Sequence, residues 1–178
     1  MEDIDAIPVD QTVTSHVEDL ALHLDRLPAI PLDDALRRQF GIETVLGKGG
    51  MGIVHSANQL ALSREVAIKR PTSASSKASA QLLREARVMG YLEHPSIPPV
   101  HLIARDEHDR PYVVMKRIEG TTMFDKIHSG GTLAERTRLF EALIAVANAI
   151  DFAHTRGIIH LDLKPSNIMI GRFGEVYV

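Results

Sequence analysis

Four glycines fall within the six residues from Gly47 to Gly52, and β-like segments flank this cluster on both sides. Ile-Glu-Thr-Val-Leu (42–46) precedes it, and Ile-Val-His-Ser-Ala (53–57) and Arg-Glu-Val-Ala-Ile-Lys (64–69) follow it. Short apolar segments separated by turn residues predict three antiparallel strands. A glycine-rich turn between the first two strands can close its backbone amides over phosphate oxygens, because no β-carbons stand in the way.

The glycine cluster fits neither of two widespread nucleotide-binding motifs. A dinucleotide-binding fingerprint requires a helix directly after the glycines, and here a strand pattern follows. A P-loop has the separation seen between Gly47 and Gly52, but it then requires Lys and Ser or Thr where this chain has Ile53 and Val54. Taken alone, the segment leaves open a hairpin turn that needs glycine only for its geometry.

The pattern beyond Lys69 predicts one helix within the sheet region and two more strands. A small, polar stretch over 71–80 indicates a loop that leads into a helix over 81–92. Strands are expected at 100–105 and 111–118, with a charged turn between them. Four apolar residues mark the buried face of the helix: Leu82, Leu83, Ala86 and Met89. The first part of the chain is therefore expected to be a five-stranded antiparallel sheet with one main helix.

After Gly120 the apolar period becomes helical. Thr132 is a candidate N-cap for a long helix over 132–156. A short strand at 158–160 and a tight hairpin over 168–178 are expected to follow it. The apolar stripe of the long helix consists of Leu139, Leu143, Val146 and Ile150, with Phe140, Ile144 and Ala147 alongside. The predicted fold class is α+β.

The first 40 residues differ in pattern from the rest. Helical spacing of apolar residues predicts an amphipathic helix over 13–27, which ends before Pro28. Asp33 is a candidate cap for a short second helix through Phe40, with Gly41 as its stop. The apolar positions of the first helix are Val13, Val17, Leu20, Leu24 and Leu27. We expect this helix to pack on the domain behind it; a partner-binding helix is the alternative.

Composition excludes several classes of function. With 20 Lys and Arg against 23 Asp and Glu, the net charge of −3 gives no basic field for nucleic acid or an anionic membrane. The absence of cysteine excludes disulfides, a thiolate nucleophile and cysteine metal sites, and it fits a reducing compartment, so a cytoplasmic location is expected. No basic leader and no run of about 18 apolar residues is present, so no export signal or membrane segment is expected.

Three motifs accompany the glycine cluster: VAIK at 66–69, LLREAR at 82–87 and HLDLKPSN at 160–167. Together with the glycines they resemble the eukaryotic-type (Hanks-type) serine/threonine protein kinases of bacteria, from about Ile42 to the last residue. The resemblance implies a protein-kinase-like fold, with a sheet-rich N-lobe and the beginning of a helical C-lobe.

The same resemblance implies that the chain divides into three parts. They are a helical extension and linker over 1–40, the kinase N-lobe over 41–118 and a partial C-lobe over 119–178. The partial C-lobe comprises the long helix, the catalytic loop and the hairpin.

The resemblance assigns a set of residues to ATP. Lys69 is expected to neutralise charge on the α- and β-phosphates, and Glu85 to hold Lys69 in place. Met115 corresponds to the gatekeeper, and the segment from Lys116 to Ile118 is expected to face adenine through its backbone. The full implied ATP site is Leu46, Gly47, Lys48, Gly49, Gly50, Met51, Gly52, Val54, Ala67, Lys69, Glu85, Met115, Lys116 and Ile118.

The loop HLDLKPSN carries the implied catalytic residues. Phosphoryl transfer needs a carboxylate beside the incoming hydroxyl, a cation near the transferring phosphoryl group and an oxygen ligand for Mg²⁺. By resemblance these are Asp162, Lys164 and Asn167, in that order, and Asn167 is the expected metal ligand. The Lys-Pro pair makes serine or threonine of a protein substrate the expected acceptor. His160 is expected to brace the loop by hydrogen bonds and not to act as the base.

The sequence departs from the family pattern at two places, and each departure changes what we expect of the protein. Leu161 replaces the arginine that pairs with a phosphorylated activation segment, so activation of that kind is not expected. The 178 residues also contain no DFG triplet, which the family places shortly after the position of Val178. We therefore expect apolar side chains of the long helix to lack cover. Either the chain is poorly stable alone, or a partner, its own residues 1–40 or self-association covers this face.

Three hypotheses remain on the sequence alone. The first is an ATP-dependent serine/threonine protein kinase domain. The second is a catalytically inactive nucleotide-binding or interaction module, such as a pseudokinase or truncated gene product. The third is an incomplete reading frame. The sequence does not identify the protein substrate, the activating signal or the oligomeric state.

Overall fold

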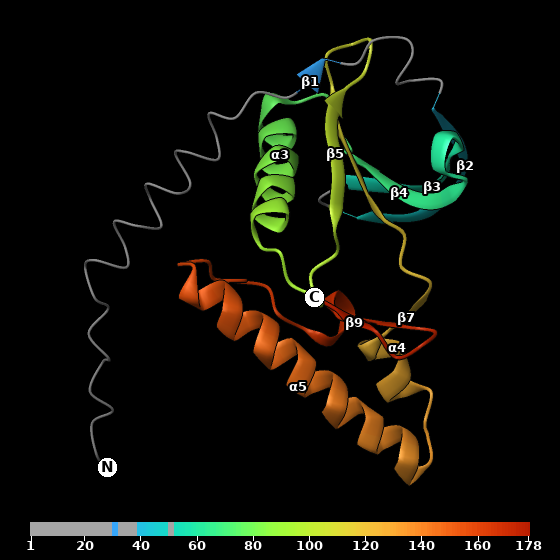
Figure 1. The fold of residues 1–178 in the computed structure, drawn as a ribbon, viewed down its shortest axis with the longest axis vertical. Helices are drawn as coiled ribbons and strands as arrows, with labels where there is room; N and C mark the ends of the chain where they lie inside the picture. Colours follow the sequence, from blue (N-terminus) through green and yellow to red (C-terminus); the bar gives the residue numbers. More distant parts are fainter. Residues whose placement is uncertain (1–29, 32–38, 50–51) are drawn as a thin grey trace.

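The computed structural model describes residues 30–31, 39–49 and 52–178, and it divides into an upper sheet with one helix and a lower helical part with a small sheet (Figure 1). The upper sheet has six strands in the order β1-β5-β6-β4-β3-β2. Their bounds are β1 Ile30–Pro31, β2 Phe40–Gly49, β3 Gly52–Gln59, β4 Arg64–Arg70, β5 Val100–Arg105 and β6 Pro111–Lys116.

Five of these strands, β2 to β6, form the predicted antiparallel sheet. The prediction of five strands is one short, because Ile30–Pro31 adds a two-residue strand that pairs parallel with β5. Strand β2 begins at Phe40, so Phe40 and Gly41 do not end a helix as expected. The predicted helix over 13–27 and the cap at Asp33 lie outside the described residues.

Alternation of side chains gives the sheet two apolar faces. On one face the core cluster consists of Ala57, Val66, Ile68, Ala104, Tyr112 and Val114, all buried. On the other face Val113 packs against Leu82 and Ala86 of helix α3, Ser76–Tyr91. Three of the four residues predicted to mark the buried face of this helix are buried, and the fourth, Met89, is partly buried. The single helix therefore covers one face of the sheet.

Helix α3 begins five residues earlier than predicted. Ser75 is its N-cap, and the Ser75 hydroxyl accepts a hydrogen bond from the backbone N–H of Ala78 at 3.2 Å. A serine cap satisfies one of the backbone donors that the first helical turn leaves free. Residues 76–80 are therefore helical, although their polar composition alone indicated a loop.

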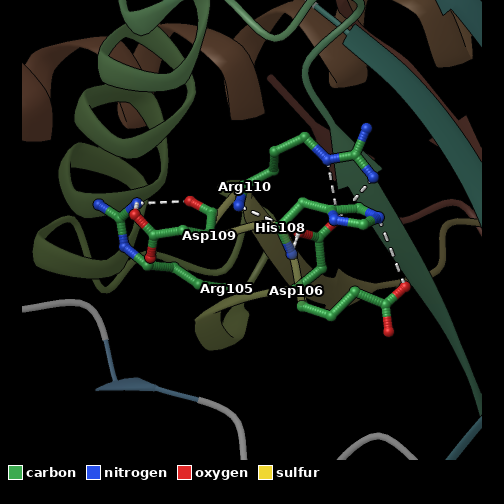
Figure 2. A network of polar contacts seen from close by, with 6 residues as sticks. Arg105, Asp106, His108, Asp109 and Arg110 are labelled. Carbon is green, nitrogen blue, oxygen red and sulfur yellow. Dashed lines mark hydrogen bonds and ion pairs between the residues drawn. The ribbon is translucent and has the colours of Figure 1, made fainter.

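The charged turn between β5 and β6 is held by a local polar network (Figure 2). The Asp106 carboxylate accepts hydrogen bonds from the backbone N–H groups of His108 and Arg110 at 2.9 and 3.0 Å. Arg105 donates to the backbone oxygen of Asp109 at 2.7 Å. Asp109 has a φ of 59°, a conformation that Asp tolerates better than most residues. The predicted turn is confirmed, and the side chain of Asp106 organises it.

The lower part of the molecule contains the predicted long helix and hairpin and two elements that were not predicted. Its elements are β7 Gly120–Thr122, α4 Met123–His128, α5 Leu133–Thr155, β8 Met169–Gly171 and β9 Val176–Tyr177. The three strands form a sheet in the order β7-β8-β9. Strand β7 and helix α4 are the unpredicted elements. The predicted strand at 158–160 is wrong, since these residues form an irregular segment after α5.

Helix α5 buries a narrower stripe than its sequence suggested. Thr132 caps it in a capping box with Glu135, as the sequence indicated for Thr132. Small residues fill most of the buried positions, which are Ala142, Val146, Ala149 and Ala153. Leu139 and Ile150 of the predicted stripe are partly buried, but Leu143 is exposed. Ala142 and Val146 pack with Ile168 and Val176, and Ala153 packs with Leu92 and Ile97.

None of the helices in the described part of the chain combines the length and apolar character that crossing a bilayer requires.

Candidate functional site

The glycine-rich turn joins β2 to β3, as predicted. Gly47 stands opposite Val54, and Gly49 stands opposite Gly52; Gly50 and Met51 lie outside the described residues. At Gly52 a β-carbon would lie 2.6 Å from the backbone oxygen of Arg70, which no side chain could tolerate. The glycine is therefore required by the close approach of β3 to the end of β4.

The same glycine lies directly beside Lys69. A β-carbon at Gly52 would be 3.4 Å from two carbons of the Lys69 side chain, so the stem of Lys69 runs along Gly52. The Lys69 ammonium donates to the Glu85 carboxylate of α3, with 2.5 Å between Nζ and Oε1. The ion pair is part-buried, because the side chain of Lys69 is mostly covered. The structure thus brings together the turn, Lys69 and Glu85.

The predicted apolar walls come from three strands, with Leu46 on β2, Val54 on β3 and Ala67 on β4, the strand that also carries Lys69. Ala67 stands opposite Met115 in the β4–β6 pairing and is buried. Met115 packs with the cluster between the sheet and α3. Val54 is partly buried on β3, while Leu46 and Lys48 on β2 are exposed. Val54 pairs with Gly47 beside the glycine turn, and Ala67 stands two residues before Lys69 on β4.

Lys116 and Ile118 lie where the upper sheet passes into the lower part. Ile118 is partly buried in the segment that connects β6 to β7. The Lys116 side chain turns toward Tyr177 of β9, and its ammonium donates to the Tyr177 hydroxyl. The predicted contact of this segment with adenine uses backbone groups and stays a prediction.

The loop after α5 brings Asp162, Lys164 and Asn167 together. Lys164 Nζ lies 2.9 Å from both carboxylate oxygens of Asp162. Asn167 Nδ2 donates to the backbone oxygen of Asp162 at 2.8 Å and to its Oδ2 at 3.0 Å. A short 3₁₀ turn, Pro165–Asn167, places the asparagine beneath the carboxylate. All three predicted catalytic residues therefore share one cluster.

The backbone of this loop is held from both sides of Leu161. His160 Nδ1 accepts a hydrogen bond from the backbone N–H of Asp162 at 3.3 Å, as expected for a bracing histidine. Leu161 has a φ of 52°, and its side chain is 92% exposed. Leucine rarely adopts this conformation, so the loop stores local strain next to the Asp162 carboxylate.

Charge in the cluster favours the ionised form of Asp162. Hydrogen bonds from the Lys164 ammonium and then from the Asn167 amide lower the pKa of the Asp162 carboxyl below its ordinary value. The group is therefore a carboxylate at neutral pH. An ionised carboxylate accepts hydrogen bonds only, so it can receive and orient an incoming hydroxyl.

The oxygen atoms of this cluster suit a hard divalent cation. Both hydrogen bonds of the Asn167 side chain use Nδ2, which leaves its carbonyl oxygen Oδ1 free to act as a ligand. No cluster of three or more His, Cys, Asp or Glu able to hold a metal occurs in the described ranges. A cation held here would therefore complete its shell with water and with ligand oxygens, as Mg²⁺ commonly does.

The two groups of site residues come from different parts of the fold. Within residues 39–49 and 52–178, no hydrogen bond or ion pair joins Lys69 or Glu85 to Asp162, Lys164 or Asn167. The first group belongs to β4 and α3, and the second belongs to the loop between α5 and β8. A ligand that touches both groups would have to lie between the two parts.

Sequence reasoning missed the partner of Lys116. Tyr177 lies 61 residues away, and no spacing rule relates the two positions. It also missed helix α4, for which a signal exists: Thr122 precedes the helix and accepts a hydrogen bond from the Asp125 backbone N–H at 3.0 Å.

Comparisons with known proteins agree with this arrangement. The family model described as "Protein kinase domain" matches residues 40–177. A probable serine/threonine-protein kinase of Streptomyces coelicolor is 35% identical over 146 residues, which cover 79% of this chain and 22% of that protein. Serine/threonine-protein kinase PknB of Mycolicibacterium smegmatis is 36% identical over 149 residues, which cover 80% of this chain and 24% of the relative.

Serine/threonine-protein kinase PknD of Chlamydia caviae is 36% identical over 154 residues, covering 79% of this chain and 16% of the relative. The chain thus spans about a quarter or less of the length of these curated relatives. The matched region contains the glycine turn, the Lys69–Glu85 ion pair and the Asp162 loop. This chain therefore belongs to the protein kinase family.

Proposed function

We propose that this chain carries the ATP-binding lobe and catalytic loop of a protein kinase that phosphorylates serine or threonine residues of a protein. The observation that carries the proposal is the Lys69 side chain, whose stem runs along Gly52 of the glycine turn while Glu85 holds its ammonium. A fixed cation on the strand next to a glycine-rich turn is suited to the oxygens of a triphosphate.

We propose a division of the chain that follows from this function. Residues 41–118 form the nucleotide-binding lobe, and residues 119–178 form the first part of the catalytic lobe. Residues 1–40 form an extension that precedes them. The separation of the described residues into a six-stranded and a three-stranded sheet supports the boundary near residue 118.

ATP would lie between the two groups of site residues. Lys69 would contact the α- and β-phosphates, and the backbone of the glycine turn from Gly47 to Gly52 would cover them. Ala67 and Val54 would line the adenine pocket with apolar surface, and Met115 would close its inner end. The backbone of residues 116–118 would offer hydrogen bonds to the adenine edge.

Asp162 would act on the protein hydroxyl. Its carboxylate would accept the hydrogen bond of the serine or threonine hydroxyl and aim the oxygen at the γ-phosphorus. The new O–P bond forms as the bond between the γ-phosphorus and the β–γ bridging oxygen breaks, so ADP leaves with that oxygen. The hydroxyl proton passes to Asp162. Lys164, whose Nζ lies 2.9 Å from the Asp162 carboxylate, would balance charge on the transferring group.

Asn167 would hold a Mg²⁺ ion through Oδ1. When bound, the ion neutralises charge on the phosphate oxygens. The Nδ2 group of the same side chain keeps its hydrogen bonds to Asp162, so one residue would position both the carboxylate and the metal.

A phosphate-transfer assay tests the proposal. The protein is incubated with γ-labelled ATP, Mg²⁺ and a generic basic protein, and the wild type is compared with Asp162→Asn. We expect the variant to lose at least about 100-fold in transfer, as expected for removal of a catalytic carboxylate. Asp151→Asn, an exposed aspartate on α5, is the matched control and should transfer like the wild type. Equal transfer by the wild type and Asp162→Asn would contradict the proposal.

A further inference from the structure

Lys116 and Tyr177 join the two parts of the molecule. Lys116 ends β6 of the six-stranded sheet, and Tyr177 ends β9 of the three-stranded sheet. The Lys116 ammonium donates a hydrogen bond to the Tyr177 hydroxyl, and Nζ lies 5.0 Å from the centre of the Tyr177 ring. The contact therefore bridges the two sheets beside residues 117–119, the segment of chain that connects them.

Both partners stand on fixed backbone. The backbone N–H of Lys116 donates to the oxygen of Pro99 at 3.0 Å, and Lys116 stands opposite Val66 in the sheet. Tyr177 stands opposite Met169 of β8. Neither backbone can shift without breaking strand pairing, so the side-chain contact couples the positions of the two sheets.

The chemistry of the pair makes the contact specific. The Tyr177 side chain is buried, with 5% of the residue exposed, and a buried phenol needs a hydrogen-bond partner for its hydroxyl. A charged donor gives a stronger hydrogen bond than a neutral one, and the ring adds attraction for the cation. Lys116 can bring its ammonium to the hydroxyl while its aliphatic stem stays on apolar surface.

A second contact fixes the same strand end. The backbone N–H of Val178 donates to the oxygen of Ser96 at 2.9 Å, and Ser96 is a buried residue of the loop after α3. Leu92 and Ile97, which also follow α3 in the chain, pack with Ala153 of α5. The end of β9 is thus attached at two adjacent residues to the upper part of the molecule.

We propose that the Lys116–Tyr177 contact is a tether that holds the two lobes at one separation and so preorganises the nucleotide pocket between them. The claim about the pocket rests on the proposed function. Without the hydrogen bond, the lobes would sample a wider range of separations. ATP, which must touch both lobes, would then bind more weakly, because fewer molecules would be in the competent arrangement. Lys116 and Tyr177 are therefore positioning residues.

Distances between spin labels test the tether without any nucleotide. The chain has no cysteine, so labels can be attached at Ala80→Cys on α3 and Asn148→Cys on α5, both exposed positions. We expect a narrow distribution of label distances in the otherwise unchanged chain and a broader one after Tyr177→Phe or Lys116→Met. Both substitutions together should broaden it no further than either alone, because they remove the same contact.

Two further variants separate the tether from general loosening. Tyr91→Phe removes the hydroxyl of an exposed tyrosine on α3 and should leave the distances unchanged. Lys116→Arg retains a cationic donor and should narrow the distribution relative to Lys116→Met. ATP affinity, measured on the same variants without labels, should fall about three- to tenfold in Tyr177→Phe and Lys116→Met, the size expected for losing one hydrogen bond.

The outcomes are distinct. An unchanged distance distribution in Tyr177→Phe overturns the tether, as does equal broadening in Tyr91→Phe. Broader distances with unchanged ATP affinity overturn the preorganisation of the pocket. If the wild-type chain binds no ATP, the proposed function fails, and the label distances alone then decide whether the tether exists.

Discussion

The six-stranded sheet and helix α5 bury their apolar side chains to very different degrees. In the sheet, Val66, Ile68, Val113 and Val114 are at most 1% exposed, because each belongs to a packed core cluster on one of the two faces. On α5, Phe140 is 68% exposed, and Leu143 and Ile144 are also exposed, although the sequence of the helix is as apolar as that of the strands. The upper part completes its own core, whereas α5 leaves Phe140, Leu143 and Ile144 uncovered by the described part of the chain.

This difference in burial means that the sheet core and the exposed face of α5 contribute differently to the free energy of unfolding. Contacts within the sheet come from pairs of strands that the turns bring together, so they depend little on anything else. The exposed face of α5 gains nothing from burial within the described residues, so large side chains there contribute little to the free energy of unfolding.

The largest expected effect is on the free energy of unfolding. Ile68→Ala, in the sheet core, should destabilise the protein by about 2–5 kcal/mol, because it leaves a cavity in a packed core. Phe140→Ala, on α5, should change stability by less than about 0.5 kcal/mol, because that side chain makes few buried contacts. Urea unfolding of both variants measures the contrast.

Equal destabilisation by the two substitutions would break the comparison. It would mean that the α5 face is covered in solution, and a rise of melting temperature with protein concentration would then identify self-association as the cover. The sequence-based expectation of a partner, of residues 1–40 or of self-association on this face stays a prediction.

Helix caps in the two regions give the next largest effect. The Thr132 side chain and Glu135 form a reciprocal capping box at the start of α5, whereas Ser75 makes a single cap bond at the start of α3. Thr132→Ala should destabilise the protein by about 1–2 kcal/mol and Ser75→Ala by about 0.5–1 kcal/mol. A larger effect at Ser75, measured by thermal unfolding, would contradict the expectation that the reciprocal capping box stabilises its helix more than the single cap bond does.

The smallest expected effect is on the pH dependence of stability. Partial burial tends to raise the pKa of Asp106, but hydrogen bonds from the backbone N–H groups of Arg110 and His108 and from the Arg110 side chain lower it overall. The backbone and hydroxyl of Thr132 lower the pKa of Glu135 in the same direction. Both carboxylates therefore stabilise the fold above their ordinary pKa values and lose that contribution as pH falls through the lowered values.

The Asp106 site should show the larger dependence, because its carboxylate is more shielded from water. We expect Asp106→Asn to flatten the fall in unfolding free energy on acidification more than Glu135→Gln does. The measurement is urea unfolding at a series of pH values from neutral to acidic. A stronger flattening by Glu135→Gln would reverse this comparison of the two regions.

Local sequence patterns predicted the elements that carry the candidate site residues better than they predicted which side chains are buried. The glycine turn, VAIK and the HLDLKPSN loop are each made of residues close in sequence, so a short pattern is enough to recognise them. The structure pairs Lys69 of VAIK with Glu85, and it brings Asp162 and Lys164 together within the loop. The ATP and catalytic roles of these residues remain proposals. Burial that depends on contacts between distant parts of the chain was harder to predict. The α5 stripe was misjudged at Leu143, because periodicity cannot tell which side of an apolar helix meets a sheet.

The short strands β1 and β7 were not predicted from the sequence, for a related reason. Strand β7 has three residues and β1 has two, so neither has enough length for a period of two to be visible. Gly120 of β7 is required by contact: a β-carbon there would lie 2.1 Å from the backbone oxygen of Ile170. Only the fold, which brings β8 beside β7, reveals why glycine stands at that position.

The binding of ATP to Lys69→Met tests the central claim most directly. In the proposed site the ammonium of Lys69, which Glu85 holds, contacts the phosphates of ATP. Titration calorimetry should give a dissociation constant at least about tenfold higher in Lys69→Met than in the wild type, about 1.4 kcal/mol. Lys77→Met, an exposed lysine on α3, should bind like the wild type. Equal affinity in the wild type and Lys69→Met would contradict the account.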